Sequence, residues 1–553
     1  MTKSQSNRLP QFSSWRIFPI VFVALFLLHA PLLRLPFFWD EAGYYVPAAY
    51  DLAHFHTLLP QSTLDTGHPP LSAAYLAFWF AISGWKPAVA RVVMLLLAAF
   101  ALTNVFLLAR RLTTTGVAVA TTIATAVYPV FFAQSSLAHA DLTAAAFTLW
   151  GIRLTVEKRL WPSSLAFSLA VLSKETAVIT PLALALWAVL RSRDGSGHSR
   201  PYRVAVALVP VVPLLAWLFY HHHATGRFFG NAEFYQYNVT QALSPLRFLL
   251  ALGIRTWHLL GNMNMLALTA ATTVAMFYPA VEDETGVRDR IAIPVQLQFA
   301  LIMLAHVLTF SLLGGALLTR YLLPVYPLVI MLGMSTLHRR IARWEWPAAA
   351  MIIFFVLALF FDPPYRIAPE DNLTYKDFVE LHVRAARFLE QHEKDTAVLA
   401  AWPATDELTK PYLGYVHRPF QVFQVQDFTI ETLLKARPMR SQYQVAYLFS
   451  TKYETSTWFQ SKVWEKLNRR FFDYHRDVSP EAAAELLGGK VVFLARSKGE
   501  WVEIVEIEQP SSVAAQCNRV VTMDGYPTAS RKRPHHRPMD GDVVPQVAKN
   551  QSD

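Results

Sequence analysis

Long apolar runs separated by short polar loops dominate the first two thirds of the chain. A helix needs ~20 mainly apolar residues to cross a hydrocarbon core of ~30 Å, and runs close to this length recur between residues 17 and 362. The pattern predicts about eleven membrane-spanning helices. They are expected near 17–35, 88–109, 115–133, 140–157, 160–173, 175–191, 202–220, 262–280, 291–314, 321–337 and 346–362.

Three further apolar segments do not fit as spans. Residues 69–84 are short, begin with two prolines and are rich in aromatic side chains. A helix that lies in the membrane interface suits them better than one that crosses the bilayer. Residues 40–56 and 243–260 invite the same interpretation. Large loops lying along one side of the membrane would cover a cavity there.

The remainder of the chain has a different pattern. Residues 371–393 predict an amphipathic helix, and several short apolar segments predict strands. Strands that alternate with helical stretches favour a small α/β domain. The pattern therefore predicts a membrane domain at 1–362, a soluble α/β domain at 363–525 and a disordered tail at 526–553. The predicted strands are 396–403, 419–428, 444–450, 490–497 and 501–508.

Composition agrees with this division. The chain of 553 residues is 53% hydrophobic and only 16% charged, whereas soluble domains carry roughly 25% charged residues. The formal charge of +10 sits largely in short loops between spans and in the tail RKRPHHRP, so it does not indicate a nucleic-acid partner. The single cysteine, Cys517, excludes an internal disulfide framework and a cysteine-cluster metal site.

The distribution of Lys and Arg sets the expected orientation. With a cytoplasmic N-terminus, the inside loops carry 16 of these residues and the longer outside loops carry 8, as the positive-inside rule requires. An odd number of spans then places the C-terminal domain outside the cytoplasm. The first apolar run is long enough to remain as a span, so no cleavable signal is expected. We expect a multi-pass protein of the cell (inner) membrane with an extracytoplasmic C-terminal domain.

Polar residues with catalytic potential collect in the predicted outer loops. Asp40 and Glu41 follow the first span directly, beside aromatic rings. A carboxylate at the edge of a low-dielectric region could serve as a general base; alternatively, Asp40 caps an interfacial helix. His68 precedes two prolines in TGHPPL, where it could bind a phosphate oxygen or only cap the turn.

The next two outer loops contribute further candidates. His139 and Asp141 stand at the start of a returning span. Asp141 could act with Asp40 on a hydroxyl acceptor or hold a cation, or it could only cap its helix. Lys174 and Glu175 lie in the tight turn SKET, where a lysine could bind phosphate or extend to the interface.

A later loop adds a basic and an aromatic residue. Arg320 and Tyr321 stand at the outer start of a span within LLTRYLLPVYP, and arginine suits bidentate phosphate contact. Another outer loop, residues 221–238, holds three successive histidines with Tyr235 and Tyr237. Adjacent histidines cannot all face one ion, whereas the tyrosines would suit stacking on a sugar. Together, the acidic and basic residues of the outer side could bind a lipid phosphate and deprotonate an acceptor.

Five of these motifs occur in an order that resembles a known superfamily. They are the acidic pair after the first span, GHPPL, AHADL, the SKE turn and TRYLLPVYP. In this order they resemble the bacterial members of the GT-C superfamily of membrane glycosyltransferases. The nearest groups are the protein O-mannosyltransferase-like enzymes and the lipid A aminoarabinose transferases. The resemblance covers about residues 15–340.

The resemblance implies an inverting transfer of a sugar from a polyprenyl-phosphate donor on the outer face of the membrane. It implies that Asp40, with Glu41 beside it, is the base, and that Asp141 is the second acidic position. His68, Lys174 and Arg320 would contact the donor phosphate. Two departures qualify this assignment: HPP stands where aminoarabinose transferases usually have KPP, and the C-terminal domain does not resemble the carbohydrate-binding domains of mannosyltransferases.

The sequence therefore predicts an α-helical polytopic membrane protein of GT-C type that acts as a glycosyltransferase. The acceptor would be a hydroxyl or phosphate of a lipid, glycan or protein. No cofactor is required by this chemistry, although a divalent cation stays possible. A transporter or flippase of lipid-linked sugars is the main alternative, but it should carry its charges near the bilayer midplane. A membrane-anchored structural or binding subunit would leave the outer charges unexplained.

Overall fold

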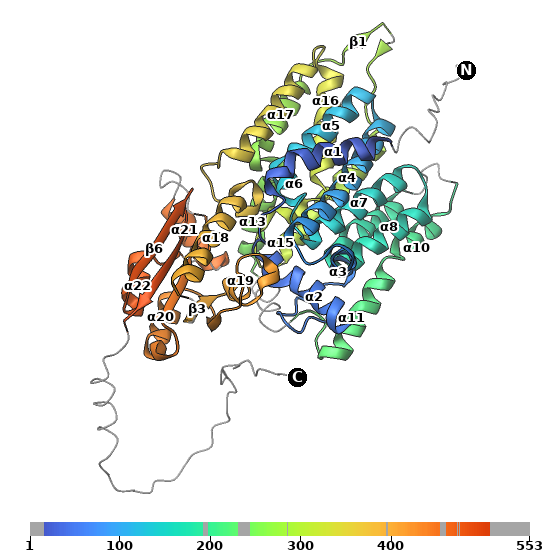
Figure 1. Ribbon diagram of the computed structural model, residues 1–553. Helices are drawn as coiled ribbons and strands as arrows, with labels where there is room; N and C mark the ends of the chain where they lie inside the picture. Colours follow the sequence, from blue (N-terminus) through green and yellow to red (C-terminus); the bar gives the residue numbers. More distant parts are fainter. Residues whose placement is uncertain are drawn as a thin grey trace, which may run out of the picture. The chain divides into compact units, whose positions relative to one another are not determined.

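The computed structural model describes residues 16–191, 197–230, 244–284, 286–313, 315–393, 396–453, 461–472, 474 and 476–508 (Figure 1). The compact unit that ends at Glu508 contains all of these residues. Tyr235, Tyr237, Cys517 and the tail at 526–553 lie outside the described residues, as does the end of the predicted α/β domain. The predicted domain boundaries remain predictions.

Most of the described residues up to Phe360 are helical (Figure 1). The first helices are α1 (Ile17–His29), α2 (Val46–Phe55), α3 (Leu71–Ser83), α4 (Pro87–Leu112), α5 (Thr115–Val127), α6 (Pro129–Gln134), α7 (Ala140–Val156), α8 (Leu160–Ser173) and α9 (Ile179–Leu190). They are followed by α10 (Arg200–Leu208), α11 (Val211–Thr225), α13 (Pro245–Leu260), α14 (Met265–Ala275), α15 (Ile293–Leu312), α16 (Tyr326–Arg340) and α17 (Glu345–Phe360). A small hairpin, β1 (Glu282–Asp283) and β2 (Gly286–Val287), precedes α15.

Three helical segments of the described chain are long and apolar enough to cross a membrane: α4, α10 continued by α11, and α15. Six further apolar helical segments are shorter than a full span. The predicted number of eleven spans is therefore not confirmed, although a helix starts near each predicted span. Helix α3 has 13 residues and is about 20 Å long at 1.5 Å per residue. Helix α5, which coincides with a predicted span, has the same number of residues, so the interfacial assignment of α3 remains a prediction.

Helix α4 lies at the centre of the helical part. It packs against α1, α5 and α7, and most of its side chains are buried, including Ala98, Ala99 and Leu102. Small side chains let helix backbones approach closely, which replaces the hydrophobic driving force that lipid does not supply. This packing fixes the starts of α4 and α7, at which the first and second of the predicted outer loops end.

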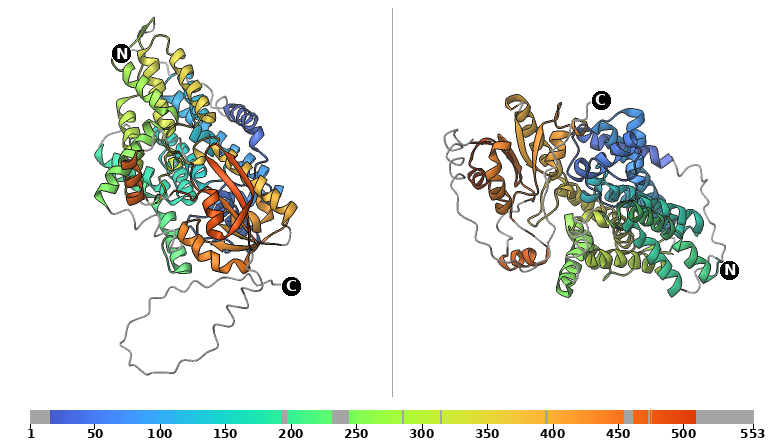
Figure 2. Two further views of the ribbon diagram at one scale, coloured as in Figure 1. Left: turned by 90° about the vertical axis from the view of Figure 1, so that its left-hand side faces the viewer. Right: turned by 90° about the horizontal axis from the view of Figure 1, so that it is seen from below.

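A five-stranded sheet forms the C-terminal part, in the order β4-β3-β5-β7-β6. Strand β3 is parallel to β4 and β5, whereas β7 is antiparallel to β5 and β6. Each predicted strand overlaps an observed one, and the sheet lies to one side of the long helices in Figure 1 and in the right-hand view of Figure 2. The strands are β3 (Ala397–Ala401), β4 (Gln421–Val425), β5 (Val445–Phe449), β6 (Gly489–Ser497) and β7 (Glu500–Ile507).

Helix α18 (Thr374–His392) packs against β6 and β7. It starts three residues later than the predicted helix because 369–371 form a short 3₁₀ turn, η8 (Pro369–Asp371). The smaller helices of this part are α19 (Ala404–Thr409), α20 (Ile430–Ala436), α21 (Lys462–Phe472) and α22 (Pro480–Leu487).

The C-terminal domain docks on the first outer loop. The Oη of Tyr415 donates to the carbonyl of Phe37 at 2.9 Å, and the N–H of Phe37 donates to the carbonyl of Leu413 at 3.3 Å. Further along the loop, Lys410 Nζ donates to the carbonyl of Ser62 at 2.7 Å. The loop that carries Asp40 is therefore held from two sides, by the helices and by this domain.

Candidate active site

A cavity of about 1080 Å³ lies between the helical part and the C-terminal domain. One wall comes from α13 and from the turn η7 (Thr319–Leu322), and the other from segment 364–371 and the C-terminal domain. Asp40, Arg320 and Tyr321 line it, as does Glu370. Typical small-molecule sites measure ~300–1,000 Å³, so this cavity has room for a sugar and part of an acceptor.

Arg320 contacts three carboxylates in this site. Its Nη1 donates to Oε1 of Glu370 at 2.6 Å, its Nη2 donates to Asp40, and its Nε lies 3.3 Å from Oδ2 of Asp141. Only 4% of the side chain is exposed. Burial alone lowers the pKa of this guanidinium, but the charges of Asp40, Glu370 and Asp141 raise it well above its ordinary value. Arg320 is therefore a fixed cation that holds three carboxylates from three separate segments together.

Asp141 and Lys174 form a second layer behind the cavity. Lys174 Nζ donates to Oδ1 of Asp141 at 2.7 Å, and both side chains are more than nine-tenths buried. Asp141 lies in the first turn of α7, where a carboxylate is favoured by the helix dipole. Its two oxygens face Lys174 and Arg320, so the predicted second acidic position meets two predicted cations.

The adjacent carboxylates Asp40 and Glu41 have different surroundings. Glu41 is fully buried and does not line the cavity. Arg91 binds it in a bidentate manner, with Nη1 2.5 Å from Oε1 and Nη2 2.9 Å from Oε2. The backbone N–H groups of Phe38 and Ala138 donate to the same carboxylate at 2.7 and 2.5 Å. Glu41 thus joins the first outer loop, α4 and the second outer loop, whereas Asp40 faces the cavity.

The residue before Asp40 has a strained backbone. Trp39 has φ 40°, a left-handed conformation that costs a bulky residue about 1–3 kcal/mol. Its ring packs on Phe378, Trp402 and Phe449 of the C-terminal domain, with centroid distances of 5.4, 5.7 and 6.1 Å. A single π-helical turn follows at Glu41–Tyr45, a feature frequent at functional sites. The C-terminal domain therefore stabilises the backbone conformation that directs Asp40 into the cavity.

Three cations surround the ring of Tyr321. Lys174 Nζ lies 4.5 Å from the ring centroid, and the guanidinium carbons of Arg255 and Arg320 lie 5.4 and 5.9 Å from it. Arg255 comes from α13, and its Nη1 donates to the carbonyl of Leu318 at 2.6 Å. The sequence analysis did not assign Arg255 to the site. This concentration of positive charge beside the cavity suits a phosphate.

His68 and Glu175, two predicted site residues, contact each other but do not line the large cavity. His68 Nδ1 is 2.8 Å from Oε2 of Glu175, and His68 lines a separate small pocket of about 40 Å³, enough for about one water. His139 is buried, with Nδ1 2.9 Å from Oε1 of Gln134. Both imidazoles flank the ring of Tyr45, at 6.1 and 5.7 Å. Neither histidine lines the large cavity, so the structure does not bring His68 beside Asp40.

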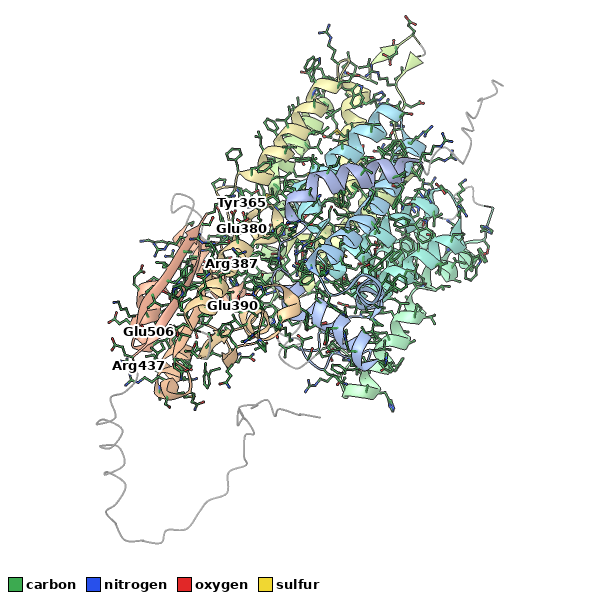
Figure 3. All side chains as sticks on the ribbon, viewed as in Figure 1. Tyr365, Glu380, Arg387, Glu390, Arg437 and Glu506 are labelled. Carbon is green, nitrogen blue, oxygen red and sulfur yellow. The ribbon has the colours of Figure 1, made fainter. Side chains whose placement is uncertain are left out.

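Sequence reasoning missed two acidic residues of the cavity, Glu370 and Asp371 in η8. Burial raises the pKa of Asp371 to about 7, although Thr319 donates a hydrogen bond to it. The signal was present in the sequence, because this acidic pair follows the last apolar run as Asp40 and Glu41 follow the first. Tyr365, on the same segment between α17 and α18, also lines the cavity (Figure 3).

The successive histidines of α11 do not converge. His221 Nε2 lies 2.7 Å from Oδ2 of Asp65, whereas the ring of His222 stacks on Phe228 at 4.1 Å. Among the residues that the structure describes, no group of three or more His, Cys, Asp or Glu is placed to hold a metal ion.

Comparisons with known proteins agree with this architecture. Residues 67–217 match the family model of the dolichyl-phosphate-mannose-protein mannosyltransferases. A search of curated proteins finds no match. Among solved structures, ArnT from Cupriavidus metallidurans in the apo state is 15% identical, with a TM-score of 0.53, over 90% of this chain and 98% of that one.

Two further structures are similar at greater distance. ArnT from Cupriavidus metallidurans bound to undecaprenyl phosphate is 15% identical with a TM-score of 0.51, over 90% of this chain and 98% of that one. The archaeal oligosaccharyltransferase AglB from Archaeoglobus fulgidus is 11% identical with a TM-score of 0.38, over 89% of this chain and 74% of that one. The fold of this chain is similar to that of ArnT, as the resemblance of the sequence motifs to the GT-C superfamily implied. The resemblance found in the sequence motifs is thereby confirmed at the level of the fold.

Proposed function

We propose that this protein is an inverting glycosyltransferase that moves a sugar from a polyprenyl-phosphate donor to a hydroxyl or phosphate of an acceptor. The observation that carries the proposal is Arg320, which gathers Asp40, Asp141 and Glu370 at the edge of a large cavity. The family match of residues 67–217 and the undecaprenyl phosphate bound by the structurally similar ArnT support the choice of donor.

Asp40 is the proposed general base, because Asp40 lines the cavity whereas the adjacent Glu41 does not. In the reaction an acceptor oxygen attacks the anomeric carbon of the donor sugar, and its proton passes to Asp40. The bond between the anomeric carbon and the phosphate oxygen breaks, and polyprenyl phosphate departs with that electron pair. General-base assistance contributes about 10²–10⁴ in rate.

The cations around Tyr321 are the proposed contacts of the donor phosphate. Arg320, Arg255 and Lys174 are buried beside the cavity, where fixed positive charge stabilises a developing phosphate more than it would in water. Their side chains are already held by carboxylates, carbonyls and the tyrosine ring, so little reorganisation is needed when charge develops. His68 and Glu175, which lie apart from the cavity lining, are proposed as supports of the first outer loop.

The direct test uses the purified protein in lipid nanodiscs with a radiolabelled polyprenyl-phosphate sugar. Asp40→Asn keeps the shape of the side chain and removes the base, so we expect transfer and donor cleavage to fall about 10²–10⁴-fold. Asp283→Asn is the matched control, because Asp283 is exposed on the hairpin before α15. Undiminished donor cleavage by Asp40→Asn would rule out the catalytic assignment.

A flippase of lipid-linked sugars remains the competing function. It would move the intact donor across proteoliposome membranes without releasing polyprenyl phosphate, whereas the enzyme releases it.

The placement of the site at the outer face of the cell membrane, with the C-terminal domain outside the cytoplasm, is part of the proposal. Accessibility of single cysteines introduced into the C-terminal domain of the Cys517→Ser protein to an impermeant thiol reagent would test it.

We also propose that transfer needs no metal ion. The guanidinium of Arg320 lies among three carboxylates, at the position where a divalent cation would otherwise neutralise them. We expect activity in EDTA to stay within about two-fold of activity with Mg²⁺ or Mn²⁺, since the fixed cation supplies the charge. Loss of transfer in EDTA with recovery on adding Mn²⁺ would contradict this.

A further inference from the structure

The wall of the cavity that belongs to the C-terminal domain carries a buried carboxyl group with an unused oxygen. Glu500, the first residue of β7, lines the cavity and is 2% exposed. Its Oε2 has no hydrogen-bond partner among the described residues. A buried polar atom without a partner costs ~1–3 kcal/mol, which a ligand that bonds to it would recover.

The surroundings of Glu500 decide what kind of partner it can take. Burial raises its pKa well above the ordinary value, and the nearby charges of Asp377, Asp362 and Glu370 raise it further, against Lys498. These surroundings favour the neutral form of the carboxyl. A neutral carboxyl both donates and accepts a hydrogen bond, as a sugar hydroxyl does.

A second group without a described hydrogen-bond partner lies on the same wall. Arg366, on the segment that leads to η8, lines the cavity, and its guanidinium carbon lies 3.6 Å from the ring centroid of Tyr474. The ring fixes the plane of the guanidinium, while Nη1 is buried without a hydrogen-bond partner in the described part of the chain. Glu500 and Arg366 thus both line the cavity, each with one buried polar atom that has no described hydrogen-bond partner.

Aromatic rings surround these two groups. Tyr365, Trp402 and Trp464 line the cavity with Tyr474. Flat rings that combine apolar area with a polar edge suit the mixed surface of a sugar, which has C–H faces and hydroxyl edges.

We propose that this wall is the acceptor subsite, and that the acceptor is a glycan whose sugar unit binds Glu500 and Arg366 between aromatic rings. The inference rests on the proposed function, because it assigns the acceptor of the same reaction. It divides the cavity: the cations beside Tyr321 hold the donor phosphate, Asp40 takes the proton, and the C-terminal domain holds the sugar that receives the transfer.

Binding without donor tests the proposal apart from catalysis. Isothermal titration of the full chain in nanodiscs would use linear trisaccharides of glucose, galactose, mannose and N-acetylglucosamine, with inorganic phosphate and a serine-containing peptide as comparators. We expect saturable binding of at least one trisaccharide. Glu500→Leu should weaken it about 10-fold or more because two hydrogen bonds are lost, whereas Glu500→Gln should stay within about three-fold.

The matched control is Glu503→Leu. Glu503 lies on the same strand and is equally buried, but it does not line the cavity, so its variant should bind the trisaccharide as the wild type does. Arg366→Ala should weaken binding about 10-fold, and thermal melting of each variant reports its folding. Absence of trisaccharide binding, binding of the peptide or phosphate in its place, or wild-type affinity in Glu500→Leu would overturn the proposal.

The two proposals fail in different ways. If the acceptor assignment alone is wrong, the wild-type protein still releases polyprenyl phosphate from the donor, and Asp40→Asn still abolishes this release. If the protein is not a glycosyltransferase, donor cleavage is absent whether or not trisaccharides bind.

Discussion

Arg320 Nη1 lies 2.6 Å from Oε1 of Glu370, although the two residues belong to different parts of the fold. Arg320 precedes α16, and Glu370 lies in the turn that leads into α18 of the C-terminal domain. The pair is almost fully buried, so it fixes the guanidinium that also contacts Asp40. The C-terminal domain thus takes part in the site through the segment that connects it to the helices.

Removing the charge of Glu370 should slow transfer. In Glu370→Gln the guanidinium of Arg320 loses a charged partner and shifts relative to Asp40, so we expect kcat to fall about 10-fold. Steady-state kinetics with the polyprenyl-phosphate sugar would measure it. Glu380→Gln is the matched control, because Glu380 is half exposed on α18 and pairs only with a neighbouring lysine in the described contacts (Figure 3). Equal rates for both variants would contradict the role of Glu370.

The ring of Trp39 should matter for rate more than for donor binding. In Trp39→Ala the packing on Phe378, Trp402 and Phe449 is lost, and the strained backbone before Asp40 can relax. We expect kcat to fall about 10–100-fold with little change in donor KM, because a small displacement of the base is costly. Trp346→Ala, at an exposed position of α17, should have normal kinetics. A raised KM with unchanged kcat would show that Trp39 contacts the donor instead.

Breaking the pair of Arg91 and Glu41 should destabilise the fold. Both side chains are fully buried, and removing one partner leaves a buried charge uncompensated at a cost of about 3–5 kcal/mol. We expect Arg91→Met to lower the free energy of unfolding by this amount, measured by denaturant titration in detergent. Glu431→Gln, which breaks an exposed pair with Lys435 on α20, should cost less than about 1 kcal/mol. Similar losses in both variants would refute the structural role of Glu41.

Stability should depend on pH through Asp371. Its pKa is raised from 3.8 to about 7, mainly by burial, so the native state binds a proton that the unfolded chain has already released above pH 4. The stabilisation is fully present below pH 4 and is lost as the pH rises through about 7. Asp371→Asn mimics the neutral form and should gain melting temperature relative to wild type between pH 5 and 8. Melting curves that stay parallel across this range would exclude the effect.

Local pattern accounts for much of what the sequence predicted. Segment 160–173, the shortest predicted span, coincides with α8, and each predicted strand overlaps an observed one. These features follow from periodicity and length, which neighbouring residues determine. The predicted outer residues Asp40, Asp141, Lys174 and Arg320 do meet in the structure, because the outer ends of packed helices lie near one another.

The sequence by itself determined the membrane class and the positions of most helices and strands. It also indicated the end of the helices at which polar residues gather. Hydrophobicity is a property of each residue along the chain, so these features follow from local sequence. Only the tertiary structure separated Asp40 from Glu41, since the partners of Glu41 lie 50 and 97 residues away. It also moved His68 out of the cavity lining and brought in Glu370, Arg255 and Glu500. Ion pairs and cavities depend on which distant segments pack together, and no local pattern specifies that packing.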